Sequence, residues 1–273
     1  MLESLHFTYN GKSSKDYGVF IGTVGGGLFR ENFSPNRTIV ETTAVGNPIP
    51  FLQRVDEGIS TFTFQIVVVD LKMRNQLRSI ARWLYLDEYK PLVFESNPDI
   101  QIDAMFTGKS EFIHNGVYDG YITLTVKPRT PYLQSIPHKL TWKSTNTPSS
   151  FEFYNNGDKP LRFRMNIKKT ISNGDVIIRN EDYNEELKIN TLFKDEEVLV
   201  DCRWEFLKSS LEERLIRYLG DAHNDVWLEI EPEDEVKLTF IGNFEIEMEY
   251  RYTYYFYDKE NYDGNKEFGQ CNL

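Results

Sequence analysis

An acidic stretch, EIEPEDE, runs from Glu229 to Glu235 and gathers carboxylates that could coordinate a hard cation such as Ca²⁺. The stretch lacks the ligand pattern and the glycine of an EF-hand loop, which favours a solvated acidic loop. The histidines are too scattered for the ligand spacing of a zinc site. They are His6, His114, His138 and His223. We therefore expect no metal centre.

The sequence NGKSS, residues 10–14, resembles a phosphate-binding loop only in part. A Walker A motif needs a second glycine five positions before Gly11, and the chain has His6 there. Cys202 and Cys271 form no CxxC pair, and the sequence contains no G-x-S-x-G motif. No catalytic constellation stands out, so we expect no enzymatic activity and no cofactor.

Three arginines, Arg74, Arg78 and Arg82, recur at a spacing of four in a segment with a helical pattern. That spacing places them in one row on the helix surface, opposite an apolar stripe. The stripe consists of Leu77, Ile80, Ala81 and Leu84. The arginine row is either a solvated face or a docking face for an acidic partner surface.

Trp142 and Trp227 both fall in the second half of the chain. Tryptophan stacks on sugars and on partner side chains, so both are candidate partner or glycan contacts. Packing in a core or an interface is the alternative.

The elements around this helix are strands. LHFTY, an Asn-Gly turn and YGVFIGTV predict a hairpin, and ISTFTFQIVVVD alternates like a strand whose last residues are buried on both faces. Residues 45–58, VGNPIPFLQRVDEG, are turn-rich and indicate an arm or flap. Strands return after the helix in PLVFE, IQIDAMFTG and YITLTVK. One helix among strands predicts an α+β sandwich in the first half.

The second half shows strand patterns at the regular spacing that is typical of a β-sandwich. DVWLEIE is one of them, and FEIEMEY has its glutamates on one face and its apolar residues on the other. The exception is SSLEERLIRYLG, which predicts a short helix. The proline-rich VKPRTPYLQSIPH separates a domain of residues 1–135 from one of residues 136–273.

Charge is unevenly shared along the chain. The net charge of the whole is −11, and nearly all of it comes from residues 137–273. An acidic chain does not wrap nucleic acid through phosphate contacts, although it could line a passage that DNA crosses without binding. The sequence has no long apolar run and its start is unlike a signal peptide, so we expect no membrane segment and synthesis in a cytosol.

The order of these elements resembles the distal tail protein (Dit) family of siphophages, long non-contractile-tailed phages. The resemblance covers residues 1–135, and its motifs are FTYNGKSSKDYGVFIG, STFTFQIVVVD, the helix ending in RWL, PLVFESNPD, and YITLTVKPRTPY.

The resemblance implies a mainly β protein with an N-terminal belt domain and a C-terminal galectin-like β-sandwich. It also implies a structural virion protein, made in the host bacterial cytoplasm, that closes as a hexameric ring at the end of the tail tube. Its partners would be the tube, the tail-tip or baseplate proteins and receptor-binding proteins, with DNA passing through the lumen. We expect the sheet edges and the arm to make the ring contacts. The alternative is a carbohydrate-binding adhesion module that recognises the host cell wall.

Overall fold

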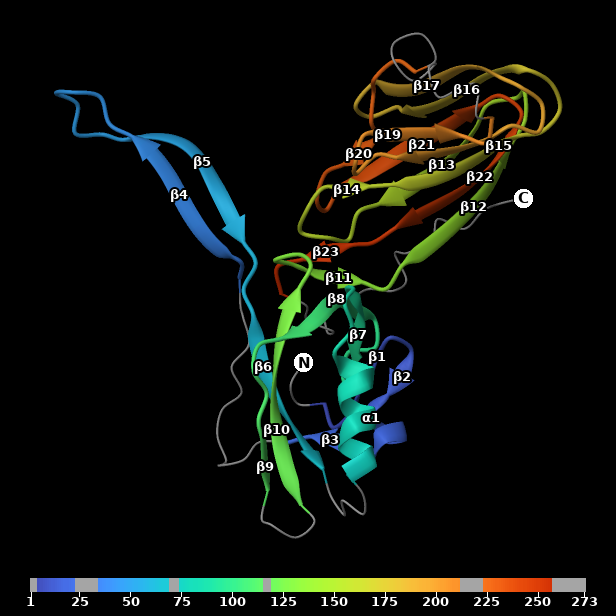
Figure 1. Cartoon of the computed structure of the whole chain (residues 1–273). Coiled ribbons are helices and arrows are strands. Elements are labelled where there is room, and N and C mark those ends of the chain that lie inside the picture. The colour runs from blue at the N-terminus through green and yellow to red at the C-terminus, as the bar shows by residue number, and fades with distance from the viewer. Residues whose placement is uncertain (1–3, 23–33, 69–73, 115–118, 212–222, 257–273) are drawn as a thin grey trace. The chain divides into compact units, whose positions relative to one another are not determined.

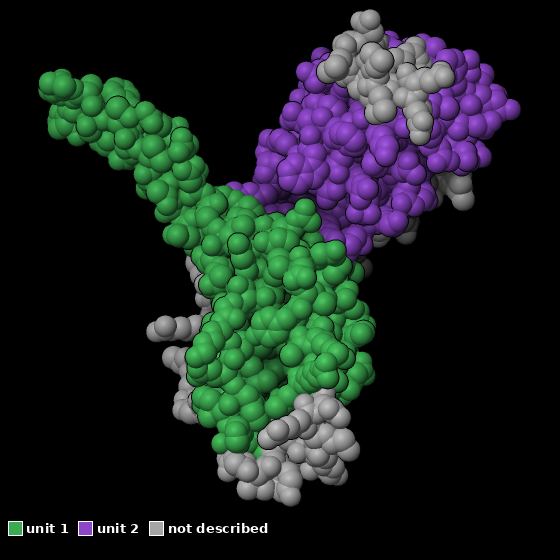
Figure 2. All heavy atoms as spheres, in the orientation of Figure 1, with its two compact units in different colours: residues 1–136, 255–259 green, residues 137–254, 260–273 purple. Residues whose placement is uncertain are grey.

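The computed structural model describes residues 4–22, 34–68, 74–114, 119–211 and 223–256. The chain divides into two compact units (Figure 2). Unit 1 comprises residues 1–136 and 255–259, and unit 2 comprises residues 137–254 and 260–273.

Unit 1 begins with the predicted Asn-Gly turn. Strands β1 (Phe7–Tyr9) and β2 (Lys12–Ser13) pair antiparallel. Asn10 and Gly11 between them have φ values of 50° and 72°, the left-handed pair that a type I′ turn requires. The turn was therefore correctly predicted.

The predicted partner of the first strand was wrong. A 3₁₀ helix, η1 (Ser14–Tyr17), follows β2 and redirects the chain before β3 (Val19–Ile21). Strand β3 consequently pairs with β6 (Phe62–Val68), while β1 pairs with β7 (Lys90–Phe94).

The remaining strands of unit 1 complete one antiparallel sheet in the order β2-β1-β7-β8-β10-β6-β3 (Figure 1). They are β8 (Ile100–Thr107), β9 (Phe112–His114), β10 (Gly120–Pro128) and β11 (Leu133–Ser135). The Ile21 N–H donates to the carbonyl of Leu5, 2.8 Å away, and this bond joins β3 to the segment that enters β1. In β6, Ile66 and Val68 are buried and Val67 is half-buried, while Val69 lies outside the described residues, so burial of this strand's end on both faces stays a prediction.

Helix α1 (Arg74–Leu84) covers this core, as its position in the sequence predicted. Its buried side chains are Ile80, Trp83 and Leu84, while Leu77 is half-buried and Ala81 is exposed. The four residues of the predicted apolar stripe lie on one side of the helix, where they line a common hollow, and Trp83 adds a buried ring that the stripe did not include.

Strands β4 (Asn36–Thr42) and β5 (Phe51–Gly58) form a separate two-stranded sheet (Figure 1, blue). Among the described residues they pair only with each other, in a register that shifts between Val40 and Glu41. We call residues 36–58 the arm. The sequence had indicated an arm at residues 45–58, and β5 is a strand that the pattern did not reveal.

Unit 2 is built from two larger antiparallel sheets and one short pair, β14-β20. The first sheet has the order β12-β22-β15-β18-β19 and the second β13-β21-β16-β17. Their strands are β12 (His138–Ser144), β13 (Ser149–Tyr154), β14 (Leu161–Arg162), β15 (Arg164–Lys169), β16 (Gly174–Asn180), β17 (Glu185–Leu192), β18 (Glu197–Asp201), β19 (Phe206–Ser209), β20 (Glu229–Ile230), β21 (Glu235–Ile241) and β22 (Phe244–Tyr250). The short strand β23 (Thr253–Tyr254) belongs to none of these three sheets.

Strand β22 has the alternation that the sequence predicted. Its apolar residues are buried and Glu245 and Glu247 are exposed. The predicted strand DVWLEIE is reduced to β20, because Asp225 has φ 58° and interrupts an extended conformation. Most of the predicted helix SSLEERLIRYLG, residues 212–220, lies outside the described residues.

Candidate interaction surfaces

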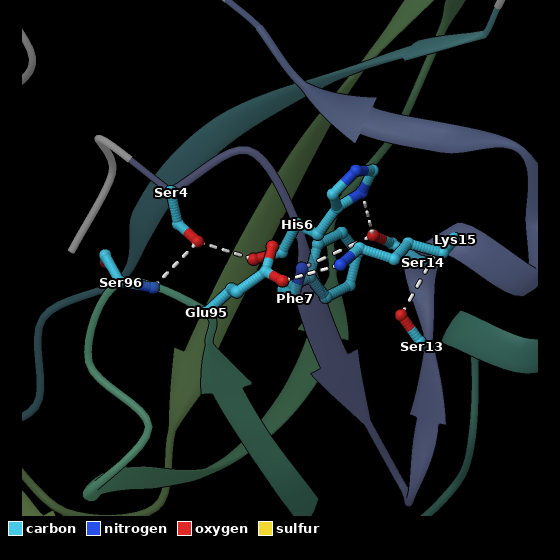
Figure 3. A network of polar contacts seen from close by, with 8 residues as sticks. All are labelled: Ser4, His6, Phe7, Ser13, Ser14, Lys15, Glu95 and Ser96. Atoms are coloured by element: carbon cyan, nitrogen blue, oxygen red, sulfur yellow. Dashed lines mark hydrogen bonds and ion pairs between the residues drawn. The ribbon is translucent and has the colours of Figure 1, made fainter.

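A network of polar contacts surrounds the start of unit 1 (Figure 3). Ser4 Oγ donates to the carbonyl of His6 at 2.6 Å and accepts the N–H of Ser96 at 3.1 Å. His6 Nδ1 lies 3.1 Å from Ser14 Oγ, which also lies 3.3 Å from the N–H of Phe7. Ser14 is fully buried, so this serine–histidine contact cannot meet a substrate, and its effect is to fix the chain before β1.

The arginine row lies on α1, where Arg78 and Arg82 are exposed. Arg74 is the first residue of the helix, and its side chain lies outside the described residues. Within the described part of the chain, neither Arg78 nor Arg82 forms an ion pair. Like charges four apart repel, and a cation at the start of a helix opposes the macrodipole. The arginine row therefore does not stabilise the helix. This favours a role for these side chains in contact with another molecule.

Trp142 is half-buried between the two larger sheets of unit 2. Its ring lies 5.2 Å from that of Phe151 and 5.9 Å from that of Phe240, and its Nε1–H donates to Ser149 Oγ at 3.0 Å. These contacts join β12 to β13 and β21. In this chain Trp142 acts in packing between the sheets.

Trp227 precedes β20 and is also half-buried. Its ring lies 4.5 Å from that of His223, and its Nε1 donates to Asp225 Oδ1 at 3.2 Å. Burial lowers the pKa of His223, against the opposing effect of Asp225. No described contact joins Trp227 to Trp142, so the two predicted contact residues do not form one platform.

The acidic stretch that follows is engaged by neighbouring side chains. Glu229 accepts a hydrogen bond from Arg162, and Asp234 accepts one from the hydroxyl of Tyr183. The hydrogen bond to Asp234 raises the pKa of Tyr183 to about 12. Among the described residues, no group of three or more metal-binding side chains could hold a metal ion.

Two exposed aromatic residues of unit 2 were not singled out from the sequence. Trp204 is 72% exposed and lies on the tight connection between β18 and β19, and Phe206, the first residue of β19, is 47% exposed. The base of this connection is held by Asp201, whose carboxylate pairs with Arg203 at 2.9 Å. Two aromatic residues in RWEF, between short strand patterns, are the signal that would have found them.

The arm of unit 1 exposes a set of large apolar side chains. Ile49 is 70% exposed, and Phe51 and Leu52 are each 61% exposed. Val45 and Ile39 are also exposed. Residues 42–53 contain no charged side chain, and we call them the arm tip. Charged residues of the arm lie nearer its base, where Arg37 is 3.6 Å from Glu57.

An apolar groove of about 280 Å³ lies beside α1, between the helix and the strands β9 and β10. We call it the α1 groove. The residues that line it carry no charge. They are Leu77, Ile80, Ala81, Leu84, Tyr85, Gly108, Ser110, Phe112, Ile122 and Leu124. Tyr85 Oη donates to Ser110 Oγ at 2.5 Å and joins the two walls at the rim.

A second groove, of about 440 Å³, crosses the five-stranded sheet of unit 2. Its charged side chains face one another in pairs: Lys143 lies 3.0 Å from Glu245, and Lys168 lies 3.1 Å from Glu197. Such exposed pairs are each worth about 0–1 kcal/mol and cancel one another's field. Glu247 also lines the groove, and its partner Lys139, 2.8 Å away, is not among the lining residues, so the lining carries one more carboxylate than ammonium group.

The two units are those of a phage tail protein. Residues 2–128 match the family model described as a phage tail protein N-terminal domain, and residues 135–252 match the one described as a phage tail C-terminal domain. Together the models cover most of the chain, which therefore belongs to this family of phage tail proteins.

Within that family, the fold is that of a distal tail protein. The crystal structure of the SPP1 Dit (gp 19.1) protein, described as a paradigm of the hub adsorption apparatus in phages that infect Gram-positive bacteria, matches with a TM-score of 0.65 and 15% identity. The match covers 90% of this chain and 98% of that one. This confirms the resemblance seen in the sequence and the mainly β, two-domain fold.

Two further proteins are similar over nearly their whole length. The SPbeta prophage-derived uncharacterized protein YomH of Bacillus subtilis (strain 168) is 28% identical over 254 residues, which are 92% of this chain and 98% of that protein. A chain of the phage P2 baseplate in its activated conformation with Ca matches at 8% identity and a TM-score of 0.49, over 90% of this chain and 97% of that one.

No helix in the described part of the chain is long and apolar enough to cross a membrane.

Proposed function

We propose that this chain is the hub of the tail tip. Six copies close into a ring at the distal end of the tail tube, unit 1 forms the belt, and unit 2 is a galectin-like β-sandwich at which tip or receptor-binding proteins attach. DNA passes through the lumen without specific binding, and the ring is assembled in the host bacterial cytoplasm and remains in the virion tail. Family membership and the Dit fold support this function.

The observation that carries the proposal is the arm. A two-stranded hairpin is at best marginally stable alone in water, and the arm pairs with no other strand in the part of the chain that the structure describes. Its exposed apolar side chains add a surface that a soluble monomer rarely leaves open. Both facts are explained if the arm is covered in an assembly.

A ring needs two different surfaces on each copy, because a head-to-tail contact closes by rotation. The arm is one such surface. The free edges of the unit 1 sheet and the arginine row of α1 offer others, toward a neighbouring copy or toward the tube.

Negative-stain images of the purified chain test this proposal. The matched variant replaces residues 43–50 by an Asn-Gly turn, which keeps the hairpin and removes the apolar end of the arm. We expect rings with a central hole from the natural chain and single particles from the variant. Single particles from both, at every protein concentration, would contradict the ring.

A second function, a carbohydrate-binding adhesion module, is favoured by one observation. Trp204 presents an open aromatic ring with Phe206 close to it in the chain, and sugars stack on such rings. Trp142 and Trp227 are half-buried, which leaves Trp204 as the better candidate for a glycan contact.

Retention on a column of bacterial cell-wall polysaccharide tests the second function. The natural chain would be retarded, and Trp204→Ala would elute with the void volume. Trp227→Phe serves as the control, because it keeps a half-buried aromatic ring elsewhere in unit 2. Unretarded elution of the natural chain would exclude this function for the polysaccharide used.

A further inference from the structure

We propose that the arm tip of one copy docks in the α1 groove of the next copy. The inference rests on the proposed ring and names the contact that closes it. It joins two features of unit 1 that have no partner within the described chain: an uncharged apolar protrusion and an uncharged apolar hollow.

The arm tip is built to enter a hydrophobic site. Over twelve residues it has no charge, and its Val45, Ile49, Phe51 and Leu52 side chains all point into solvent. Pro48 and Pro50 restrict the backbone beside Ile49, so less conformational freedom is lost when this segment is held by a partner. A protrusion that is already ordered by pairing in β4 and β5 binds at a lower entropic cost than a disordered tail.

The α1 groove offers what such a segment needs. Its walls are a helix on one side and the β9–β10 pair on the other, and both carry apolar side chains that are incompletely buried. Leu77, Phe112 and Ile122 are half-buried, and Ala81 is exposed. Ala81 keeps the helix side of the groove open, because a larger residue at this position would fill it.

The shape of the opposite wall is fixed by Gly120. A Cβ atom at this position would lie 2.5 Å from the carbonyl oxygen of Ile113 and 2.5 Å from Cε2 of Phe112. Only glycine therefore permits the close approach of β9 and β10 that brings the Phe112 ring into the groove lining. The hollow is thus a defined feature of this fold.

We assign a second copy of this chain as the occupant of the α1 groove, because the apolar segment that would fit the groove, the arm tip, belongs to the same sequence. No arm residue is among the described residues that line the groove, so the tip of the same copy does not fill it. Tip and groove are different surfaces, so their contact is head-to-tail and leaves each copy with one free tip and one free groove until the ring closes. The charged residues at the base of the arm, such as Arg37 and Glu57, lie outside the proposed contact between arm tip and α1 groove.

Disulfide trapping between two differently labelled chains tests the contact. One chain carries Val45→Cys and the other Ala81→Cys, both with Cys271→Ser, and the buried Cys202 is retained. After oxidation with diamide, we expect a covalent dimer only in the mixture of the two chains. A chain that carries both substitutions should give a ladder of covalent oligomers that ends at the closed ring. Ile171→Cys, an exposed position in unit 2, mixed with the Ala81→Cys chain is the control and should give no dimer.

A second readout avoids dependence on disulfide geometry. Val45→Glu and Ala81→Glu each place a charge in the proposed contact, and both positions are exposed, so the chain should fold. Each should weaken association by at least about tenfold, whereas Ile171→Glu should leave it unchanged. The circular dichroism and thermal midpoint of each variant establish that it is folded.

The outcomes separate this contact from the ring itself. Rings of full mass that show no cross-link and tolerate both glutamates would overturn the docking of the tip in the groove and leave the hub standing. Absence of rings in the natural chain, together with absence of cross-links in the mixture of the two cysteine variants, would overturn both. Cross-links in the mixture, with loss of rings in both glutamate variants, would establish the contact.

Discussion

The indole Nε1–H of Trp83 donates a hydrogen bond to the backbone carbonyl of Tyr9, 2.9 Å away, across 74 residues of sequence. The same indole ring stacks on Tyr17 at 4.3 Å and on Phe7 at 5.3 Å. One residue near the end of α1 therefore ties the helix to the first hairpin and to η1. The position of the helix, and with it both the arginine row and the α1 groove, depends on this side chain.

Replacing Trp83 should consequently be among the most destabilising changes in unit 1. Trp83→Ala removes a large buried ring and is expected to lower the free energy of unfolding by about 3–5 kcal/mol. Trp83→Phe keeps a ring and leaves the Tyr9 carbonyl without this donor, which costs about 1–3 kcal/mol. Urea unfolding followed by circular dichroism measures both. A Trp83→Ala variant within about 1 kcal/mol of the natural chain would refute this role.

Asp201 should make the stability of unit 2 depend on pH. Burial raises the pKa of Asp201, but the hydrogen bonds and charge of Arg203 outweigh this effect and hold it below its ordinary value. A lowered carboxyl pKa contributes stability that is present above the unfolded value, about 3.9, and is lost as the pH falls through the folded value. Arg203 is 41% exposed, so solvent screening reduces the contribution.

Asp201→Asn is therefore expected to lower the free energy of unfolding at pH 7 by about 1–2 kcal/mol. The difference from the natural chain should shrink as the pH is lowered below about 4. Thermal unfolding at a series of pH values measures this difference in the free energy of unfolding. The control is Asp87→Asn, which changes an exposed aspartate of unit 1. A difference that stays constant from pH 7 to pH 3 would show that the charge of Asp201 is not the cause.

Cys202 should be chemically silent in the folded chain. It is fully buried, and burial raises the pKa of its thiol to about 12, so almost no reactive thiolate exists at pH 8. In a Cys271→Ser background, we expect no reaction with Ellman's reagent until guanidinium is added, and then one equivalent. Full reaction of the native protein within minutes would mean that unit 2 opens readily.

Reversing the arginine row should impair assembly without unfolding the chain. Replacing Arg74, Arg78 and Arg82 together by glutamate changes the sign of the charge on the row, and the exposed Arg78 and Arg82 lose no buried contact. We expect a thermal midpoint close to that of the natural chain, together with defective ring formation or defective binding to the tail tube. Lysine at the same three positions keeps the charge and is the control. If rings and tube binding are both normal in the glutamate variant, the docking role of the row is wrong.

The strands that the sequence predicted well are those that have one buried face. In β22, alternation of glutamate and apolar residues corresponds to the two faces of the sheet, so the pattern is local and sufficient. Partners were harder to predict, because pairing depends on where the chain turns. The 3₁₀ helix at Ser14–Tyr17 sends β3 to β6, and no alternation in β3 itself reveals this.

The interaction surfaces were only partly predictable for a related reason. Trp142 and Trp227 have the composition of a binding surface, but a tryptophan in a β-sandwich is also a good core residue, and exposure depends on the whole fold. Conversely, Phe51 and Leu52 of β5 are apolar residues of a kind usually buried, and both are exposed, because the arm pairs with no other strand among the described residues. That mismatch between composition and burial appears only in the structure.

The central claim, a ring of six copies, is tested most directly by the mass of the purified protein in solution, measured by light scattering coupled to size exclusion. A ring predicts six times the chain mass of 32.1 kDa, in one peak that does not change with concentration. A single peak at 32.1 kDa at all concentrations would contradict the claim that the chain closes into a ring through its own surfaces.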